Sequence, residues 1–159
     1  MPVWNNSEES PEESAGRILK ALAAELELDP EGLALEDGYT CLAVNGTSVL
    51  HLRLAGETPA LDLFMELGVL PSGEERSGLC EDMLQGNMFF QGTGGPALGL
   101  DRERGVAALN LRLFLPGLNI ENFRGNLEIF LAAAEFWRAR IAGGAGGGEK
   151  SDTSAFIRV

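Results

Sequence analysis

The sequence predicts an α+β fold in which helices pack against an antiparallel sheet, with the element order α-β-β-β-α-β-β-α. Apolar and polar residues alternate, as in half-buried strands, over residues 39–67 and again over 96–115. Apolar residues recur at helical spacing over 15–26, 79–88 and 120–141. No two strands require a parallel crossover through a helix, so an antiparallel sheet is the expected arrangement.

Composition places the chain among globular proteins with a core of their own. Its 159 residues are 45% hydrophobic and 23% charged, which suits one domain. The net charge of −12 and the lack of a basic patch argue against nucleic acid as a partner. Cys41 and Cys80 have neither disulfide-framework nor zinc-site spacing. We find no signal peptide and no membrane-spanning run, so we expect a cytoplasmic protein.

A first helix is expected from Ala15 until Asp29-Pro30 ends it. The acidic, serine-rich residues before it are expected to form a mobile lead-in. The apolar stripe of this helix recurs at three- and four-residue spacing and consists of Ala15, Ile18, Leu19, Leu22, Ala23 and Leu26.

Three strands are expected next, over residues 39–44, 47–55 and 60–67. The dipeptide Asn45-Gly46 joins the first two and is favoured at tight hairpin turns. The third strand commits one face to the core, with Leu61, Leu63, Met65 and Leu67 on that side and Asp62, Phe64 and Glu66 on the other.

A second helix should begin near Ser72, since Glu75 lies at capping-box spacing from it. The glycine-rich turn at residues 92–95 then leads into strand 96–100, which is expected to form a second hairpin with strand 106–115. A glycine-rich turn between β-strands cannot direct backbone N–H groups at a phosphate as the start of a helix does. The turn is therefore interpreted as a structural connection between elements and not as a phosphate-binding site.

The last helix is expected to begin after Asn119, a suitable N-cap, and to end near Ile141. Its broad apolar face consists of Ile120, Phe123, Leu127, Phe130, Leu131, Ala134, Trp137 and Ile141. Three regions follow: an acidic N-terminus at 1–14, one α+β domain at 15–142, and a flexible glycine-rich tail at 143–159. The tail ends in Phe156–Val159, a candidate short docking peptide.

No arrangement of catalytic groups stands out, and we expect neither an enzyme nor a cofactor. His51 is the single histidine and lies in the middle of an expected strand, without a flanking motif. A site that needs several histidines for a metal is therefore excluded. The acidic pairs Glu74-Glu75 and Glu81-Asp82 fit a solvated helix face better than general acid–base chemistry.

In element order the chain resembles the class I chaperones of type III secretion, the Tir-chaperone family. The resemblance also covers Asp37-Gly38 before the first strand, Gly92–Gly95, Leu98-Gly99-Leu100-Asp101, and the closing Phe136-Trp137-Arg138. It implies an acidic cytoplasmic homodimer that keeps the extended N-terminal segment of a secreted effector competent for secretion, without ATP or a cofactor. It further implies that dimer contacts come largely from the second helix and its neighbouring strand, and client contacts from the first helix and the sheet.

Two sets of candidate residues follow. For the dimer interface they are Leu79, Met83, Leu84 and Met88, a stripe that suits a core equally well. For client binding they are Leu19, Leu22, His51, Arg53, Phe64 and Phe114. Two other functions stay open: an interaction adaptor of the same fold unconnected with secretion, and a small-ligand-binding protein with an apolar pocket.

Overall fold

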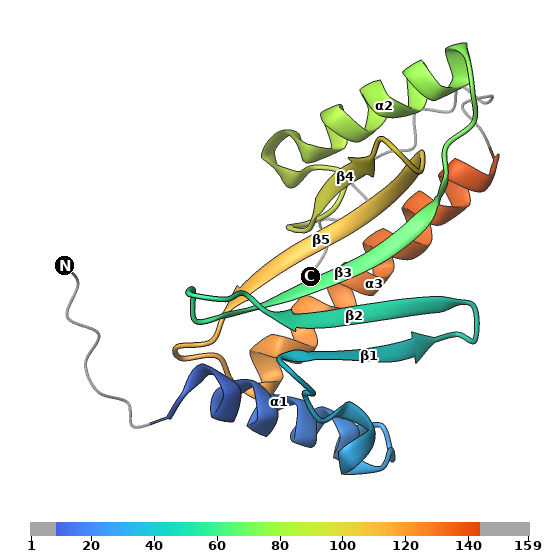
Figure 1. The fold of residues 1–159 in the computed structure, drawn as a ribbon. Coiled ribbons are helices and arrows are strands. Elements are labelled where there is room, and N and C mark those ends of the chain that lie inside the picture. Colours follow the sequence, from blue (N-terminus) through green and yellow to red (C-terminus); the bar gives the residue numbers. More distant parts are fainter. Residues whose placement is uncertain (1–8, 144–159) are drawn as a thin grey trace.

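The computed structural model describes residues 9–143; the first eight residues and the predicted tail beyond Gly143 lie outside the described part. Five antiparallel strands form one sheet in the order β1-β2-β3-β5-β4 (Figure 1). The strands are β1 (Tyr39–Val44), β2 (Ser48–Leu54), β3 (Ala60–Val69), β4 (Ala97–Asp101) and β5 (Val106–Phe114). The predicted fold class and element order are confirmed.

Helices cover one face of this sheet. The long α3 (Ile120–Gly143) crosses behind β3 and β5, and α1 (Pro11–Glu25) lies beside it (Figure 1). Helix α2 (Glu74–Asn87) lies along β4, at the edge. The short helices η1 (Pro30–Leu33) and η2 (Met88–Phe90) follow α1 and α2. No described helix crosses the opposite face, which we call the helix-free face.

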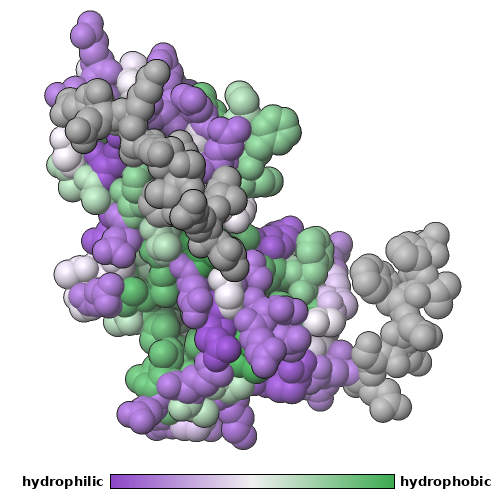
Figure 2. Space-filling view, turned by 180° about the vertical axis from the view of Figure 1, so that it is seen from behind, coloured by the Kyte–Doolittle hydropathy of each residue, from purple (hydrophilic) through white to green (hydrophobic). Residues whose placement is uncertain are grey.

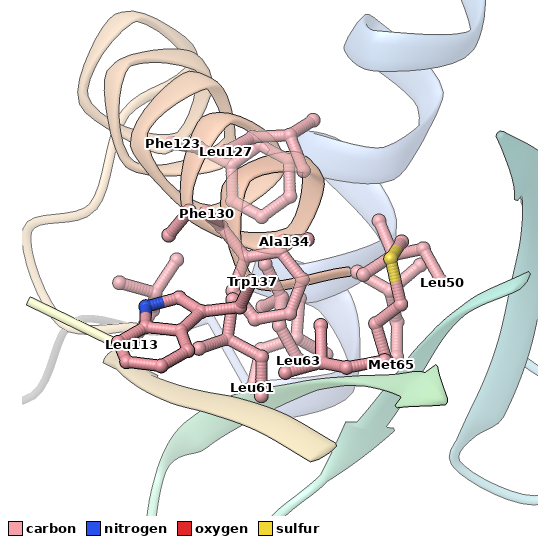
Figure 3. Packing of buried hydrophobic residues seen from close by; sticks show 14 of the residues in the cluster. Leu50, Leu61, Leu63, Met65, Leu113, Phe123, Leu127, Phe130, Ala134 and Trp137 are labelled. Atoms are coloured by element: carbon pink, nitrogen blue, oxygen red, sulfur yellow. The ribbon is translucent and has the colours of Figure 1, made fainter. Parts of the chain in front are cut away.

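The core lies between α3 and the sheet. Phe123 and Phe130 are fully buried there, and Trp137 is nearly so (Figure 3). They pack over buried strand residues, among them Leu50, Leu113 and the predicted core residues Leu61, Leu63 and Met65 of β3. Burial of these side chains is the main favourable contribution to folding.

Helix α1 begins at Pro11, inside the segment that we expected to be a mobile lead-in. Ser10 and Glu13 form a capping box: the Glu13 amide donates to the Ser10 hydroxyl at 3.1 Å, and the Ser10 amide donates to the Glu13 carboxylate at 2.8 Å. These bonds satisfy amides that the first helical turn leaves unpaired. Leu26, predicted to continue the apolar stripe, is instead exposed at the C-terminal end of the helix.

The predicted start of α2 was wrong in detail. Gly73, with a φ of +70°, is the N-cap residue, and Ser72 is not. At α3 the prediction is confirmed, because the side-chain oxygen of Asn119 accepts from the amide of Asn122 at 2.8 Å. Helix α3 then continues to Gly143, which was predicted to lie in the tail.

Candidate protein-binding surface

Alternate residues of each strand present their side chains on the helix-free face. Strand register aligns His51, Phe64, Asn110 and Ala97 in one row across four strands. Tyr39 joins this row from β1: its hydroxyl group shares a hydrogen bond with Nδ1 of His51 at 2.6 Å. Phe64 continues the row, because the centroids of the His51 and Phe64 rings are 5.7 Å apart. An aromatic row thus runs over the β1, β2 and β3 side of the face.

Ion pairs flank the aromatic row on one side. Arg112 donates from Nε and Nη2 to the two carboxylate oxygens of Asp62, at 2.7 and 2.9 Å. Arg53 approaches the same carboxylate at 3.6 Å. These guanidinium groups, Arg112 above all, hold the pKa of Asp62 below its usual value. The cluster is therefore charged and well fixed at neutral pH.

A second ion pair lies at the other side of the row. Arg104, from the turn between β4 and β5, forms a two-pronged contact with the Glu66 carboxylate, whose pKa it lowers. The face therefore has an aromatic centre between two fixed groups of charges. Such an arrangement suits a polypeptide with apolar and polar side chains better than a purely apolar ligand.

Two neighbouring hollows open on this face. One, of about 540 Å³, has Tyr39, His51, Phe64 and the Arg53–Asp62–Arg112 cluster in its lining. The other, of about 320 Å³, is lined by Phe64, Glu66, Gly99 and Ala108 among others. Phe64 and Asn110 border both. Small side chains on β4 and β5 leave room beside the aromatic row.

The six candidate client residues do not form one surface. His51, Phe64 and Arg53 come together on the helix-free face, and Phe114 projects from the end of β5 with 61% of its surface exposed. Leu19 and Leu22, by contrast, are only 1% and 2% exposed, because α1 presents them to the core. They are held by packing within the protomer, so we leave them out of the surface.

The four candidate dimer residues divide in the same way. Leu79 and Met83 face the core and are buried, whereas Leu84 and Met88 are 70% and 59% exposed. Sequence reasoning missed the neighbouring Phe89 and Phe90, of which Phe89 is 87% exposed. Hydrophobic side chains project at this end of the molecule, the upper right of Figure 2. The signal that could have identified this exposed site is the pair of adjacent aromatic residues between a helix and a glycine-rich turn.

We call Leu84, Met88, Phe89 and Phe90 the apolar knob. Its backbone is strained, since Phe89 and Phe90 have φ values of +51° and +54°, which side chains disfavour. The loop is nevertheless closed: the Gly92 amide donates to the Gly86 carbonyl oxygen at 2.9 Å. A rigid base thus holds apolar side chains in solvent, which is typical of a protein–protein contact.

The described residues include no group of three or more His, Cys, Asp or Glu side chains arranged to hold a metal ion. Among the helices of residues 9–143, none is both long and apolar enough to span a bilayer.

Residues 17–138 match the model of the Tir chaperone protein (CesT) family. Because the match covers most of the chain, this protein belongs to that family. The family is one of secretion chaperones, the class that the sequence resemblance implied.

Known proteins share part of this sequence or its fold. A Chlamydia pneumoniae protein, CPj0713/CpB0740, is 36% identical over 75 residues, which are 47% of this chain and 56% of that protein's length. One chain of the HopA1–SchA chaperone–effector complex superposes with a TM-score of 0.66 and 20% identity, over 81% of this chain and 96% of that one. The Yersinia pestis type III secretion chaperone SycH, solved with a YscM2 fragment, superposes with a TM-score of 0.61 and 23% identity. The match covers 77% of this chain and 98% of that one.

Proposed function

We propose that this protein is a cytoplasmic chaperone that binds the extended N-terminal segment of a type III secreted effector and keeps it secretion-competent, without catalysing a reaction. Family membership supports the class of function. The observation that carries the proposal is the helix-free face, where an aromatic row lies between fixed ion pairs. An extended segment can lay alternate side chains into the two hollows while its backbone pairs with a sheet edge.

Binding of this kind needs surface rather than a reactive group. Ordering the client on binding costs conformational entropy. The affinity therefore depends on the apolar area and backbone hydrogen bonds that the chaperone offers. Both hollows are open to solvent rather than enclosed, as a chain passing over the face requires. The open shape favours a polypeptide over the enclosed small ligand that the sequence left as an alternative.

We further propose that the working form is a homodimer joined at the apolar knob. Leu84, Met88, Phe89 and Phe90 are among the most exposed large hydrophobic side chains of residues 9–143, and all lie at one end of α2. Sequestering them against a second copy removes the cost of leaving them in water.

Capture of the tagged protein from its native cell, with mass spectrometry and light scattering, tests the proposal. We expect one consistent client whose recovery disappears when the client's own N-terminal segment is deleted. The variant Phe64→Asp, on the helix-free face, should lose the client, whereas Ile129→Asp, an equally apolar-to-charged change on α3, should keep it. Recovery of the client regardless of its N-terminal segment would favour the adaptor function instead.

A further inference from the structure

The larger hollow on the helix-free face carries a charge opposite to that of the chain. Its lining contains two guanidinium groups, those of Arg53 and Arg112, and one carboxylate, that of Asp62. These groups leave a net charge of +1 with His51 counted as neutral, whereas the whole chain carries −12. Because a local positive site attracts anions, a carboxylate of a partner suits this hollow.

Arg53 provides the positive charge that is left over. Arg112 donates two hydrogen bonds to Asp62, so the charges of these two side chains offset each other. The Arg53 guanidinium approaches Asp62 only to 3.6 Å, and 69% of its side chain is exposed. A guanidinium presents its N–H donors as a planar fork that matches the two oxygens of a carboxylate. Arg53 is therefore available to bind a carboxylate from a partner.

The smaller hollow has the opposite sign. The charged residues in its lining are Glu66, Asp101 and Arg104, which leave a net charge of −1. Arg104 serves both carboxylates, since it forms the two-pronged contact with Glu66 and lies 3.9 Å from Asp101. The side chains of Glu66 and Asp101 are each 41% exposed. A lysine or arginine of a partner therefore suits this hollow.

Strand β3 sets the spacing between the two charges. Asp62 lines the larger hollow, Glu66 lines the smaller one, and Phe64 borders both. A strand rises about 3.3–3.4 Å per residue, so Asp62 and Glu66 are about 13 Å apart along β3. Side chains of an extended partner that lie over these two positions are likewise four residues apart. A third side chain, midway between them, then lies over Phe64.

We propose that a stretch of the client lies along β3 and carries an acidic and a basic side chain four residues apart, with an apolar side chain midway. The acidic side chain binds Arg53, the basic one binds Glu66, and the apolar one packs on Phe64. The inference rests on the proposed function and defines the chemistry of the client within it. Opposite charges in the two hollows fix the position of the client, because a shift by two residues places a charge over Phe64.

Peptides that tile the N-terminal segment of the client recovered from the native cell test this chemistry. Fluorescence anisotropy measures their binding to the full chain, and we expect the peptide that binds to contain the predicted pattern. Replacing its acidic residue by the amide should weaken binding about fivefold, as for a partly exposed ion pair. Moving the acidic residue by one position keeps the composition but turns the carboxylate away from the face, and should weaken binding equally. A binding peptide without the pattern, or one that tolerates both changes, overturns the inference.

Variants of the chaperone assign each charged residue of the peptide to its hollow. Arg53→Gln should weaken binding of the unaltered peptide about fivefold, and the amide analogue should show no further loss because its partner is already absent. Glu66→Gln should do the same for the basic residue. Arg102→Gln, at an exposed arginine outside both hollows, is the control and should leave binding unchanged. Fully additive losses from Arg53→Gln and the amide analogue overturn the inference while the proposed function stands. Failure of the unaltered chain to bind any client would instead contradict the proposed function.

Discussion

The indole Nε1 of Trp137 donates a hydrogen bond to the backbone carbonyl oxygen of Gly92 at 2.9 Å. This bond joins α3 to the loop that carries the apolar knob, across 45 residues of sequence. Trp137 also lies against Gly86, so that one side chain braces both glycines that close the loop. Helix α3 therefore directly supports the loop that carries the proposed dimer surface.

Trp137→Phe tests that connection. The phenyl ring retains part of the packing but leaves the Gly92 carbonyl oxygen without its partner, which typically costs about 1–3 kcal/mol. We expect that loss in urea unfolding, together with faster hydrogen exchange over residues 86–95. Unchanged exchange in this loop would show that other contacts hold it.

Gly92→Ala should destabilise the protein more directly. A Cβ at Gly92 would lie 2.7 Å from the Gly86 Cα, a backbone atom that cannot move aside easily. Overpacking of this kind costs about 1–3 kcal/mol. Gly125→Ala is the matched control: Gly125 lies within α3 with open space where a Cβ would be added, and the change should stabilise the protein by about 0.5–1 kcal/mol. Thermal melting of both variants tests this prediction. A melting temperature of Gly92→Ala no lower than that of the unaltered protein would contradict the close contact between Gly92 and Gly86.

The Asp62 cluster predicts a specific pH dependence of stability. The pKa of Asp62 is lower in the folded protein than in the unfolded chain, so its contribution is complete above the ordinary pKa and is lost as the pH falls through the folded value. Asp62→Asn should therefore cost about 1 kcal/mol at neutral pH. It should also flatten the acid limb of the stability curve below about pH 4.

Urea unfolding as a function of pH provides the measurement for Asp62. Glu121→Gln removes one negative charge from an exposed position in α3 and serves as the control for net charge. An acid limb that keeps its slope in Asp62→Asn would mean that the ion pair with Arg112 does not persist in solution.

A charge placed on the apolar knob should dissociate the proposed dimer. Leu84→Glu and Phe89→Glu are expected to raise the dimer dissociation constant at least tenfold, with little change in monomer stability because both side chains are largely exposed. Leu26→Glu, an exposed leucine at the end of α1, provides the control. Sedimentation equilibrium distinguishes the outcomes, and a dimer unaffected by both knob variants would place the interface elsewhere.

Local signals in the sequence were sufficient for much of the fold. The bounds of β1 agree with the prediction because Asn45-Gly46 marks its end, and the core face of β3 follows from the alternation of its residues. Asn119 correctly predicted the start of α3. Each of these features depends on neighbours within a few residues.

Other features depend on contacts that no local pattern encodes. His51 and Phe64 meet because β2 and β3 are neighbours in a hairpin, but Phe64 lies opposite Asn110 only because β3 pairs with β5 across α2 and β4. Leu84 fits the apolar stripe of α2 by spacing, yet α2 lies at the sheet edge, so that only a narrow strip of it is covered. The two hydrogen bonds between the Asn87 side chain and the backbone of Leu98 in β4 likewise depend on a tertiary contact.

Limited proteolysis of the purified chaperone–client complex tests the central claim most directly. The account predicts that an N-terminal segment of the client, compared with the free client, resists cleavage in the presence of the chaperone, and that Phe64→Asp abolishes this protection. Equal cleavage of that segment with and without the chaperone would contradict the account.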